Sequence, residues 1–373
     1  MVEADEIRIA RTRGMGARGP LPRKRLKIED WVRRKIVCGE FGPGSGLPDR
    51  DWFMREFSAN RHSVQNAFES LKRDGFVEAV RGRGTRVVPR LPFDGRYLLV
   101  VRSSPEDVGT RFFAHALKTA AGEVARRRNV SFDVTDVADA PAGSTAYEEI
   151  LSRVRNHVYA GVFTQTVTKD HGFDTITNIN DVPIVFPNAR SDRAMGSAAA
   201  SIRGWATEEI YRLHFAECRA MGCRRIAVIS PIPVGDVALR RERIASIAAN
   251  EGLEIVRGGY QVFSMRVWND YQYRCFLELF FMSDAGREAE AVVLADDNFL
   301  VPFVETCRTL FGRDVAKRYR LFSHGNRPNL PQTDFPVVFH GFDWIATLDT
   351  FVDYSEDVRA HVPEPRRPVA VLF

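Results

Sequence analysis

The side chains best suited to chemistry lie between Asn60 and Gly75, in the stretch NRHSVQNAFESLKRDG. Apolar residues recur there at helical spacing and predict one buried face, formed by Val64, Ala67, Phe68 and Leu71. Hydrogen-bonding side chains gather at the exposed start of the same helix: Asn60, Arg61, His62, Ser63 and Gln65. Such groups can pair with base edges in the major groove of DNA. Taken alone, the stretch could equally be an ordinary surface helix.

A second basic group is the turn RGRGT, residues 81–85. Its glycines allow a close backbone approach to nucleic acid, and its arginines can neutralise phosphate. The turn lacks the GK[ST] ending of a phosphate-binding loop and leads into a strand, which excludes that kind of site. We therefore predict DNA contacts from Arg81, Gly82 and Arg83, together with Arg50 from the segment before the helix.

The surrounding elements must position these two groups. Helical spacing predicts a first helix over residues 25–38, and Asp49 can cap a second over residues 50–57. Period-two patterns at residues 76–80 and 86–88 predict a hairpin with the basic turn at its tip. Three helices followed by such a hairpin make a winged helix-turn-helix.

Residues 25–88 resemble the DNA-binding domain of the GntR family of bacterial transcription regulators. The matching positions are Ile36, Gly39, Pro43-Gly44, Leu47-Pro48, Arg61, Val64, Ala67, Leu71, Gly75 and Gly82-Arg83-Gly84-Thr85. The resemblance implies a homodimer on a near-palindromic double-stranded DNA operator. The helix that begins at Arg61 would enter the major groove, and the wing tip would reach the minor groove or the backbone.

Two positions depart from the family pattern. Asp51 stands where the family usually has an arginine, with Arg50 one position early, and Gln65 replaces the arginine that usually follows Ser63-Val64. Glutamine suits adenine, whereas arginine suits guanine or phosphate. The operator is therefore expected to differ from those common in the family.

Composition limits the class of protein. At 373 residues the chain suits two or three domains, and it contains no apolar run long enough to span a bilayer. The charged N-terminus is unlike a signal peptide, so a cytoplasmic protein without membrane contact is expected. Five scattered cysteines without a CxxC pair predict neither a disulfide framework nor a metal site. Residues 1–90 carry 20 Lys/Arg against 12 Asp/Glu, while the remainder is slightly acidic, which suggests that the first part meets phosphate.

Four segments are predicted along the chain. Residues 1–22 form a disordered basic tail, residues 23–90 the winged helix-turn-helix and residues 91–96 a linker. In residues 97–373 strand and helix patterns alternate, which predicts an α/β domain of parallel sheets with helices on both faces. Its length suits two lobes with a cleft between them.

Residues 97–373 resemble the effector domain of the LacI/GalR family, which is related to the periplasmic sugar-binding proteins. The resemblance rests on the topology and on the segments 222–229 and 294–297, and on Arg240 or Arg241 at a helix start. It implies a small, sugar-like effector in the cleft. The segment 323–326, Ser-His-Gly-Asn, departs from the family pattern.

Ligands of open α/β sheets bind beyond the carboxyl ends of the strands. Together with the resemblance, this rule predicts a ligand-binding set of Ser103, Ser104, Gln165, Arg190, Arg241, Asp296, Asp297, His324 and Asn326. Phe112, Trp205 and Trp268 could supply apolar faces for a sugar ring, with core packing as the alternative role.

These patterns favour a bacterial transcription regulator, a repressor, whose operator binding depends on that effector. No nucleophile–base set and no strand-linked GxGxxG is recognisable, so no catalytic residue, cofactor or metal is expected. Two alternatives stay open. The α/β domain could only dimerise, or it could be an enzyme with an accessory DNA-binding module.

Overall fold

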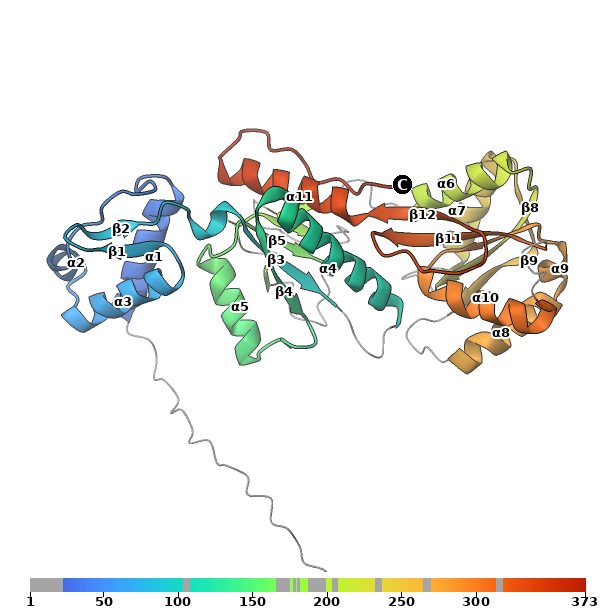
Figure 1. The fold of residues 1–373 in the computed structure, drawn as a ribbon, viewed down its shortest axis with the longest axis horizontal. Helices are drawn as coiled ribbons and strands as arrows, with labels where there is room; N and C mark the ends of the chain where they lie inside the picture. Colours follow the sequence, from blue (N-terminus) through green and yellow to red (C-terminus); the bar gives the residue numbers. More distant parts are fainter. Residues whose placement is uncertain are drawn as a thin grey trace, which may run out of the picture. The chain divides into compact units, whose positions relative to one another are not determined.

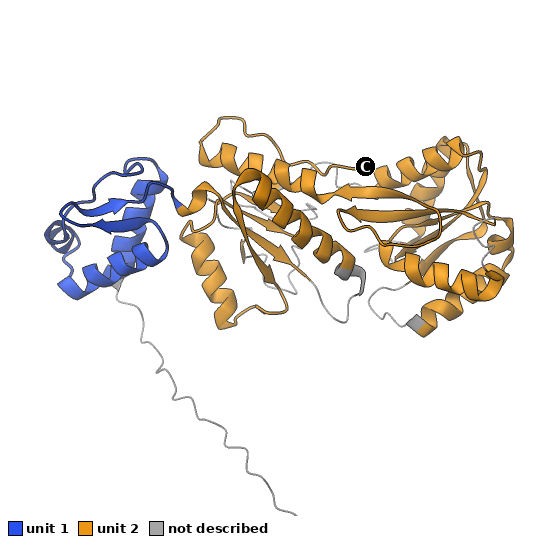
Figure 2. Ribbon diagram, in the orientation of Figure 1, with its two compact units in different colours: residues 1–91 blue, residues 92–373 orange. Residues whose placement is uncertain are grey.

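The computed structural model describes residues 23–102, 108–165, 175–176, 179, 182–186, 199–202, 207–231, 237–263, 270–312 and 318–373. The chain divides into two compact units, Met1–Leu91 and Pro92–Phe373 (Figure 2). The predicted tail 1–22 lies outside the described residues, as do the predicted ligand contacts Ser103, Ser104 and Arg190 and the aromatic residues Trp205 and Trp268.

In the described residues of the first unit, from 23 on, the chain forms three helices and a two-stranded antiparallel hairpin (Figure 1). In chain order these are α1 (Arg23–Val37), α2 (Arg50–Glu56), α3 (Arg61–Arg73), β1 (Val77–Val80) and β2 (Gly84–Val87). The apolar positions that recur at helical spacing are buried, among them Ile28, Val32, Val64, Ala67 and Leu71. The predicted winged helix-turn-helix is therefore confirmed, with boundaries that shift by one or two residues.

A buried charged group fixes α1 against the end of α3. Glu29 and Arg33 are each only 3% exposed. Arg33 Nη2 lies 2.5 Å from Asp74 Oδ2, and Ser70 Oγ donates to Glu29 Oε2 at 3.1 Å. Both buried charges therefore have partners, as low-dielectric surroundings demand.

The second unit contains two five-stranded parallel sheets, each the centre of one lobe (Figure 1). The first lobe has the strand order β4-β3-β5-β6-β7, with β3 (Arg96–Val101), β4 (Ser131–Asp136), β5 (Gly161–Thr164), β6 (Ile184–Phe186) and β7 (Ala199–Ser201). The second has the order β12-β11-β10-β8-β9, with β8 (Arg225–Pro231), β9 (Glu254–Phe263), β10 (Ala291–Leu294), β11 (Arg320–Arg327) and β12 (Val337–Asp343). In each lobe the first strand lies between the second and the third, so the strand order reverses there.

Helices cover the sheets as the alternating pattern predicts. They are α4 (Val108–Arg128), α5 (Thr145–Arg155), α6 (Thr207–Ala220), α7 (Val237–Asn250), α8 (Asp270–Met282), α9 (Asp284–Glu288), α10 (Leu300–Phe311) and α11 (Trp344–Arg359). In the second lobe, Ala227 and Ile229 of β8 pack with α8 and α10, whereas Ile226 and Val228 pack with α6 and α7. Consecutive residues thus serve opposite faces of a sheet covered on both sides. The predicted α/β fold is confirmed.

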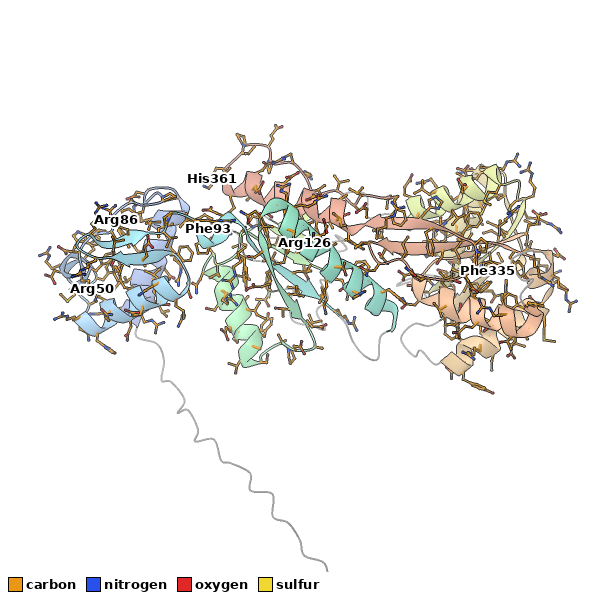
Figure 3. The ribbon with its side chains drawn as sticks, in the orientation of Figure 1. Arg50, Arg86, Phe93, Arg126, Phe335 and His361 are labelled. Atoms are coloured by element: carbon orange, nitrogen blue, oxygen red, sulfur yellow. The ribbon has the colours of Figure 1, made fainter. Side chains whose placement is uncertain are left out.

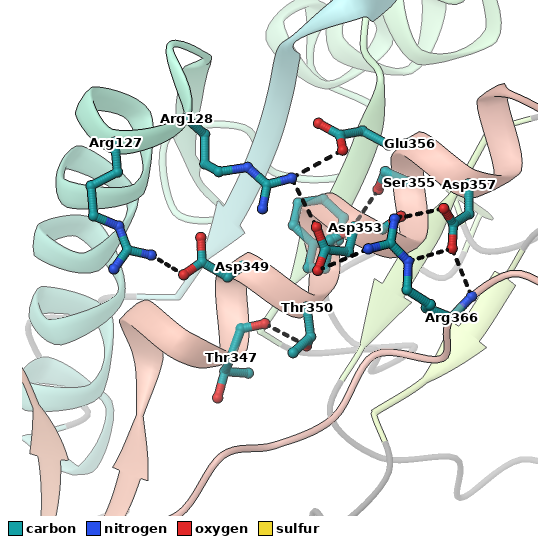
Figure 4. Close-up of polar contacts among 11 residues, drawn as sticks. Arg127, Arg128, Thr347, Asp349, Thr350, Asp353, Ser355, Glu356, Asp357 and Arg366 are labelled. Atoms are coloured by element: carbon teal, nitrogen blue, oxygen red, sulfur yellow. Dashed lines mark hydrogen bonds and ion pairs between the residues drawn. The ribbon is translucent and has the colours of Figure 1, made fainter.

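Helix α11 carries the chain from the second lobe back to the first. Trp344 and Phe351 belong to the core of the first lobe, with β3 and α4. Ion pairs join the end of α4 to α11: Arg127 contacts Asp349, and Arg128 Nη2 lies 2.8 Å from Asp353 and 3.0 Å from Glu356 (Figure 4). The segment after α11 is held by Arg366, whose guanidinium meets both carboxylate oxygens of Asp357 (Figure 4).

Several strands of the second lobe are long. Strand β9 extends over Glu254–Phe263, because Gly258, with φ of 74°, absorbs an irregularity in the pairing with β8 and the strand then resumes. Strands β11 and β12 likewise continue through polar residues and glycines. Of the predicted linker 91–96, residues Pro92–Asp94 form a short 3-10 helix, η1, and Arg96 already belongs to β3. None of the helices in the described segments is both long and apolar enough to cross a membrane.

Candidate nucleic-acid interface and ligand cavity

The start of α3 presents only part of the predicted DNA-contacting set. Arg61 and His62 are exposed, and His62 Nε2 lies 3.0 Å from Asn66 Nδ2. Asn60 caps the helix, since its side-chain oxygen accepts from the backbone N–H of Ser63 at 2.8 Å. Ser63 is 7% exposed. The prediction of a Ser63 side-chain contact with DNA is therefore corrected, because this side chain faces the core.

Arg50 and Gln65 meet on the exposed surface between α2 and α3. Arg50, labelled in Figure 3, donates to the side-chain oxygen of Gln65, and its guanidinium lies 5.7 Å from the centre of the Phe68 ring. Gln65 Nε2 in turn donates to Glu69 Oε1 at 2.8 Å. Both ends of the Gln65 amide are thus engaged, and Arg50 is held beside the N-terminal half of α3.

The wing tip is open to solvent. Arg81, Gly82 and Arg83 are exposed in the turn between β1 and β2. Gly82 has φ of 75°, a left-handed conformation that favours glycine. Arg86, labelled in Figure 3, instead donates to the Gly44 carbonyl at 2.7 Å, so it braces the wing.

The second unit contains a cavity of about 210 Å³ where residues of both lobes meet. It lies at the carboxyl ends of β8 and β10, the point of the second sheet where the strand order reverses and where such folds bind ligands. The lining residues are Phe113, Ile210, Tyr211, His214, Ser230, Pro231, Arg240, Ala295, Asp296, His324 and Phe342.

Two of the predicted ligand contacts, Asp296 and His324, line this cavity. Asp297 and Asn326 are not among the lining residues. They form a buried network in which Asn326 Nδ2 donates to Asp297 Oδ2 at 2.8 Å and Trp344 Nε1 donates to Asn326 Oδ1 at 2.9 Å. The predicted ligand contacts of Asp297 and Asn326 are corrected accordingly, because each side chain bonds within the protein.

Three further predicted residues, Arg241, Gln165 and Phe112, are not among the lining residues of this cavity, and their contacts with a ligand stay predictions. Arg240 lines the cavity, whereas the exposed Arg241 lies with its guanidinium 5.7 Å from the centre of the Tyr260 ring. Gln165 ends β5, and its side-chain oxygen accepts from the Arg102 backbone N–H at 2.8 Å, which joins the ends of β5 and β3. Phe112 is half-buried and is not among the lining residues, whereas its neighbour Phe113 is.

Burial changes the charge state of groups at the cavity and next to it. Removal from water, with the nearby carboxylate of Asp296, raises the pKa of Asp297 to about 8. Burial lowers the pKa of His324 to about 4, and it lowers the pKa of His214 well below its ordinary value. Both histidines are therefore uncharged near neutral pH. Among the described residues, no group of three or more His, Cys, Asp or Glu is placed to hold a metal ion.

Three polar lining residues were missed by sequence reasoning, namely Tyr211, His214 and Ser230. Ser230 lies at the carboxyl end of β8, so the strand-end rule could have identified it. His214 lies in the apolar stripe of α6 with Ile210 and Phe215, and a polar residue at a buried position was the available signal.

Comparison with known proteins assigns the first unit. Residues 24–87 match the family model described as bacterial regulatory proteins, gntR family. The chain is 31% identical over 105 residues to the uncharacterized HTH-type transcriptional regulator RB1450 of Rhizobium meliloti, covering 26% of this chain and 43% of that protein. It is 40% identical over 72 residues to the HTH-type transcriptional repressor NanR of Klebsiella aerogenes, covering 19% of this chain and 28% of that protein. The chain thus spans less than half the length of the curated relatives that it matches.

Solved structures assign the fold of the larger unit. A LacI regulator from Lactobacillus casei with bound Tris matches 76% of this chain and 96% of its own, with a TM-score of 0.51 and 12% identity. The Cra regulator from Pseudomonas putida in complex with fructose 1-phosphate matches 74% of this chain and 97% of its own, with a TM-score of 0.50 and 14% identity. Residues 24–87 are therefore a winged helix-turn-helix domain of the GntR family, followed by an α/β unit with the fold of the LacI-type regulators.

Proposed function

We propose that this protein is a DNA-binding transcription regulator, a repressor, whose operator binding is controlled by a small sugar-like molecule. The observation that carries the proposal is the union of a GntR-family domain with a two-lobed fold whose cavity lies at the strand-order reversal of its second sheet. A regulator of this kind works on the chromosome, which places it in the cytoplasm.

The exposed basic groups of the first unit support DNA binding. Arg61 at the start of α3 is the principal contact, with His62, Arg50 and Gln65 beside it. Arg81 and Arg83 at the wing tip neutralise phosphate. Asn60 acts on these contacts through the helix cap.

The composition of the cavity supports a small polar ligand. Arg240 and Asp296 bring a guanidinium and a carboxylate to the cavity lining, and both kinds of group hydrogen-bond to ligand hydroxyls. Phe113 and Phe342 offer apolar ring faces. A cavity volume of about 210 Å³ suits a molecule with one sugar ring.

A homodimer follows from the proposed operator, because two winged helices are needed for two half-sites. The surface of α8 supports contact between copies of the chain. Tyr271, Leu279 and Met282 lie along one side of this helix and are 75%, 72% and 67% exposed. A solution mass of twice 42.2 kDa is the expected result of sedimentation equilibrium.

In the proposed mechanism, the ligand binds between the lobes and favours one of their two arrangements. That arrangement sets the spacing of the two winged helices in the dimer, and so it changes operator affinity. The coupling works only to the extent that the ligand binds the two arrangements with different affinity.

The DNA-binding half is tested with Arg61→Ala. DNA fragments bound by the full chain are selected from genomic DNA, and their affinity is measured by gel shift for the protein and the variant. Loss of the main groove contact should weaken binding roughly tenfold or more. Arg73→Ala, at the exposed far end of the same helix, is the matched control and should retain affinity. Equal affinity of Arg61→Ala and the unaltered protein would refute the DNA-binding surface.

The same preparation separates the alternatives for the second unit. A thermal-shift screen with D-glucose, D-galactose, D-glucuronate, myo-inositol and D-glucose 6-phosphate should raise the melting temperature for at least one compound. No shift with any of them would favour a domain that only dimerises. Turnover of one of them would favour an enzyme.

A further inference from the structure

His214 is a buried histidine in the middle of α6 that lines the cavity. It is 1% exposed, and Tyr211 and Phe215 lie on the same face of the helix. Its Nε2 is buried and has no hydrogen-bond partner among the residues that the structure describes. Buried polar atoms without a partner are uncommon, since each one costs free energy on folding. Because His214 lines the cavity, we take a ligand bound there as the source of this missing partner.

The other ring nitrogen of His214 is already engaged. His214 Nδ1 lies 3.1 Å from His340 Nδ1 of β12, and the two rings are nearly perpendicular, with centres 4.9 Å apart. One hydrogen atom must lie between these nitrogens, because two bare nitrogens would repel each other and two N–H groups would clash. His340 therefore fixes the orientation of the His214 ring and links the tautomers of the two rings.

The surroundings keep His214 uncharged. Burial is the main cause of its lowered pKa, and the neighbouring His340 and His324 add to the effect. The Phe322 ring also packs against it in a T-shaped arrangement, with ring centres 6.1 Å apart. An uncharged imidazole offers the cavity either one donor or one acceptor at Nε2, as His340 decides.

We propose that His214 is a ligand-contacting residue whose Nε2 pairs with a hydroxyl group of a single-ring polyhydroxylated ligand, with His340 as its positioning residue. This inference rests on the proposed sensor function. It assigns recognition of one hydroxyl to a residue outside the set predicted from strand ends.

A hydroxyl is the ligand group that fits this position. It both donates and accepts, so it pairs with either tautomer of His214, whereas a carboxylate or phosphate requires the donor form and an ammonium group the acceptor form. A charged group would also lose water here without an opposite charge on the imidazole. Arg240 and Asp296, the charged residues of the lining, form another part of the same cavity wall.

The first test compares His214→Asn with His214→Gln. The amide of Asn lies near the position of Nδ1 and cannot reach the cavity, whereas the amide of Gln reaches the position of Nε2. Affinities are measured by calorimetry for the compound of the thermal-shift panel that binds the unaltered protein most tightly. His214→Asn should weaken binding about tenfold or more, and His214→Gln should stay within about threefold. His115→Phe, on the exposed face of α4, is the control and should change nothing.

Monodeoxy analogues of the same compound identify the hydroxyl. One analogue should bind the unaltered protein about tenfold more weakly than the parent compound does. The same analogue and the parent compound should bind His214→Asn equally well, because that variant has already lost the contact. Full affinity in His214→Asn, with circular dichroism unchanged, would overturn the inference and leave the sensor function standing. No binding of any panel compound to the unaltered protein would instead overturn the sensor function, and this inference with it.

The positioning role of His340 has its own readout. His340→Phe removes the partner of His214 Nδ1, so the His214 ring becomes free to turn. In this variant the parent compound should bind less than tenfold more tightly than the deoxy analogue that lacks the hydroxyl contacted by His214. His340→Gln keeps a hydrogen-bonding group, so the full affinity difference between the parent compound and this analogue should return. Equal discrimination of the deoxy analogue by His340→Phe and the unaltered protein would exclude the positioning role.

Discussion

Asp51 and Gln65 are the two positions at which the first unit departs from the pattern of the GntR family, and Arg50 stands one position before Asp51. The structure joins Arg50 to Gln65, since the Gln65 side-chain oxygen accepts from Arg50 while Glu69 holds the other end of the amide. An arginine one position early in the sequence is thereby brought to the surface of α3. We infer that the pair contacts DNA as one unit.

A double-mutant cycle tests this unit. Arg50→Ala and Gln65→Ala should each weaken operator binding by about 1 kcal/mol or more, and the double variant should lose clearly less than the sum. The reason is that either change alone releases the other side chain. Gel-shift titrations with the four proteins measure the coupling, and simple additivity would show that the two residues contact DNA independently.

Asp297 is a residue whose burial should be visible in the pH dependence of stability. Its pKa is raised to about 8, chiefly by burial, while an unfolded aspartate titrates near 3.8. Between these values the folded state holds a proton that the unfolded state has released. The unfolded state then binds fewer protons, so stability falls as pH rises from about 4 to about 8.

Asp297→Asn should remove this part of the pH dependence, because the amide cannot ionise. Melting temperatures at pH 5.5 and 8.0 should differ less in the variant than in the unaltered protein. Asp357→Asn is the matched control. Arg366 lowers the pKa of Asp357 to about 2, so this carboxylate stays ionised throughout the tested range and its loss should act equally at both pH values. An unchanged pH dependence in Asp297→Asn would show that Asp297 is ionised in the folded state.

Among the elements, those with strong periodicity were predictable. The helices from α1 to α3 and the first strands of each lobe follow from apolar spacing, caps and turns. The full length of strand β9 does not follow from local pattern, because the irregularity at Gly258-Gly259 interrupts the period of two. The order of the strands and the return of α11 to the first lobe depend on contacts distant in sequence, which local patterns do not encode.

In the candidate sites, too, the residues set by local pattern were predictable and those set by contacts distant in sequence were not. Arg61 and the wing tip are given by local spacing. Strand ends led to Asp296 and His324, but not to the burial of Asp297 and Asn326, because the direction of a side chain depends on packing from other elements. His214 was missed for the same reason, since its partner His340 is 126 positions away.

The contact between α1 and α3 depends on Arg33, which is buried against Glu29 and Asp74. Arg33→Ala would remove the buried cation and leave Glu29 with Arg25 and Asp74 with Arg73 as their remaining partners, which should lower the stability of the first unit by roughly 2 kcal/mol. Hydrogen exchange of α1 and α3 amides in the full chain measures this as a loss of protection. Arg34→Ala, at the exposed neighbouring position, should leave protection unchanged. Equal protection in Arg33→Ala would mean that apolar packing alone holds the two helices.

At the scale of the second unit, a polar network joins the cavity region to the core of the first lobe. Asp296 lines the cavity, and the next residue, Asp297, bonds through Asn326 to Trp344. Trp344 starts α11 and belongs to the first lobe's core. When the lobes move on ligand binding, these hydrogen bonds are either kept or broken. The lobes can therefore adopt two discrete arrangements, one with the bonds and one without them.

The central claim is that one ligand site controls one DNA-binding surface. Operator affinity is measured by fluorescence anisotropy without ligand and with the tightest-binding sugar of the panel at saturation. The expected result is a change of about fivefold or more, while Asp296→Asn binds the operator normally and no longer responds. Equal operator affinity with and without a sugar shown to be bound would mean that the cavity does not control DNA binding.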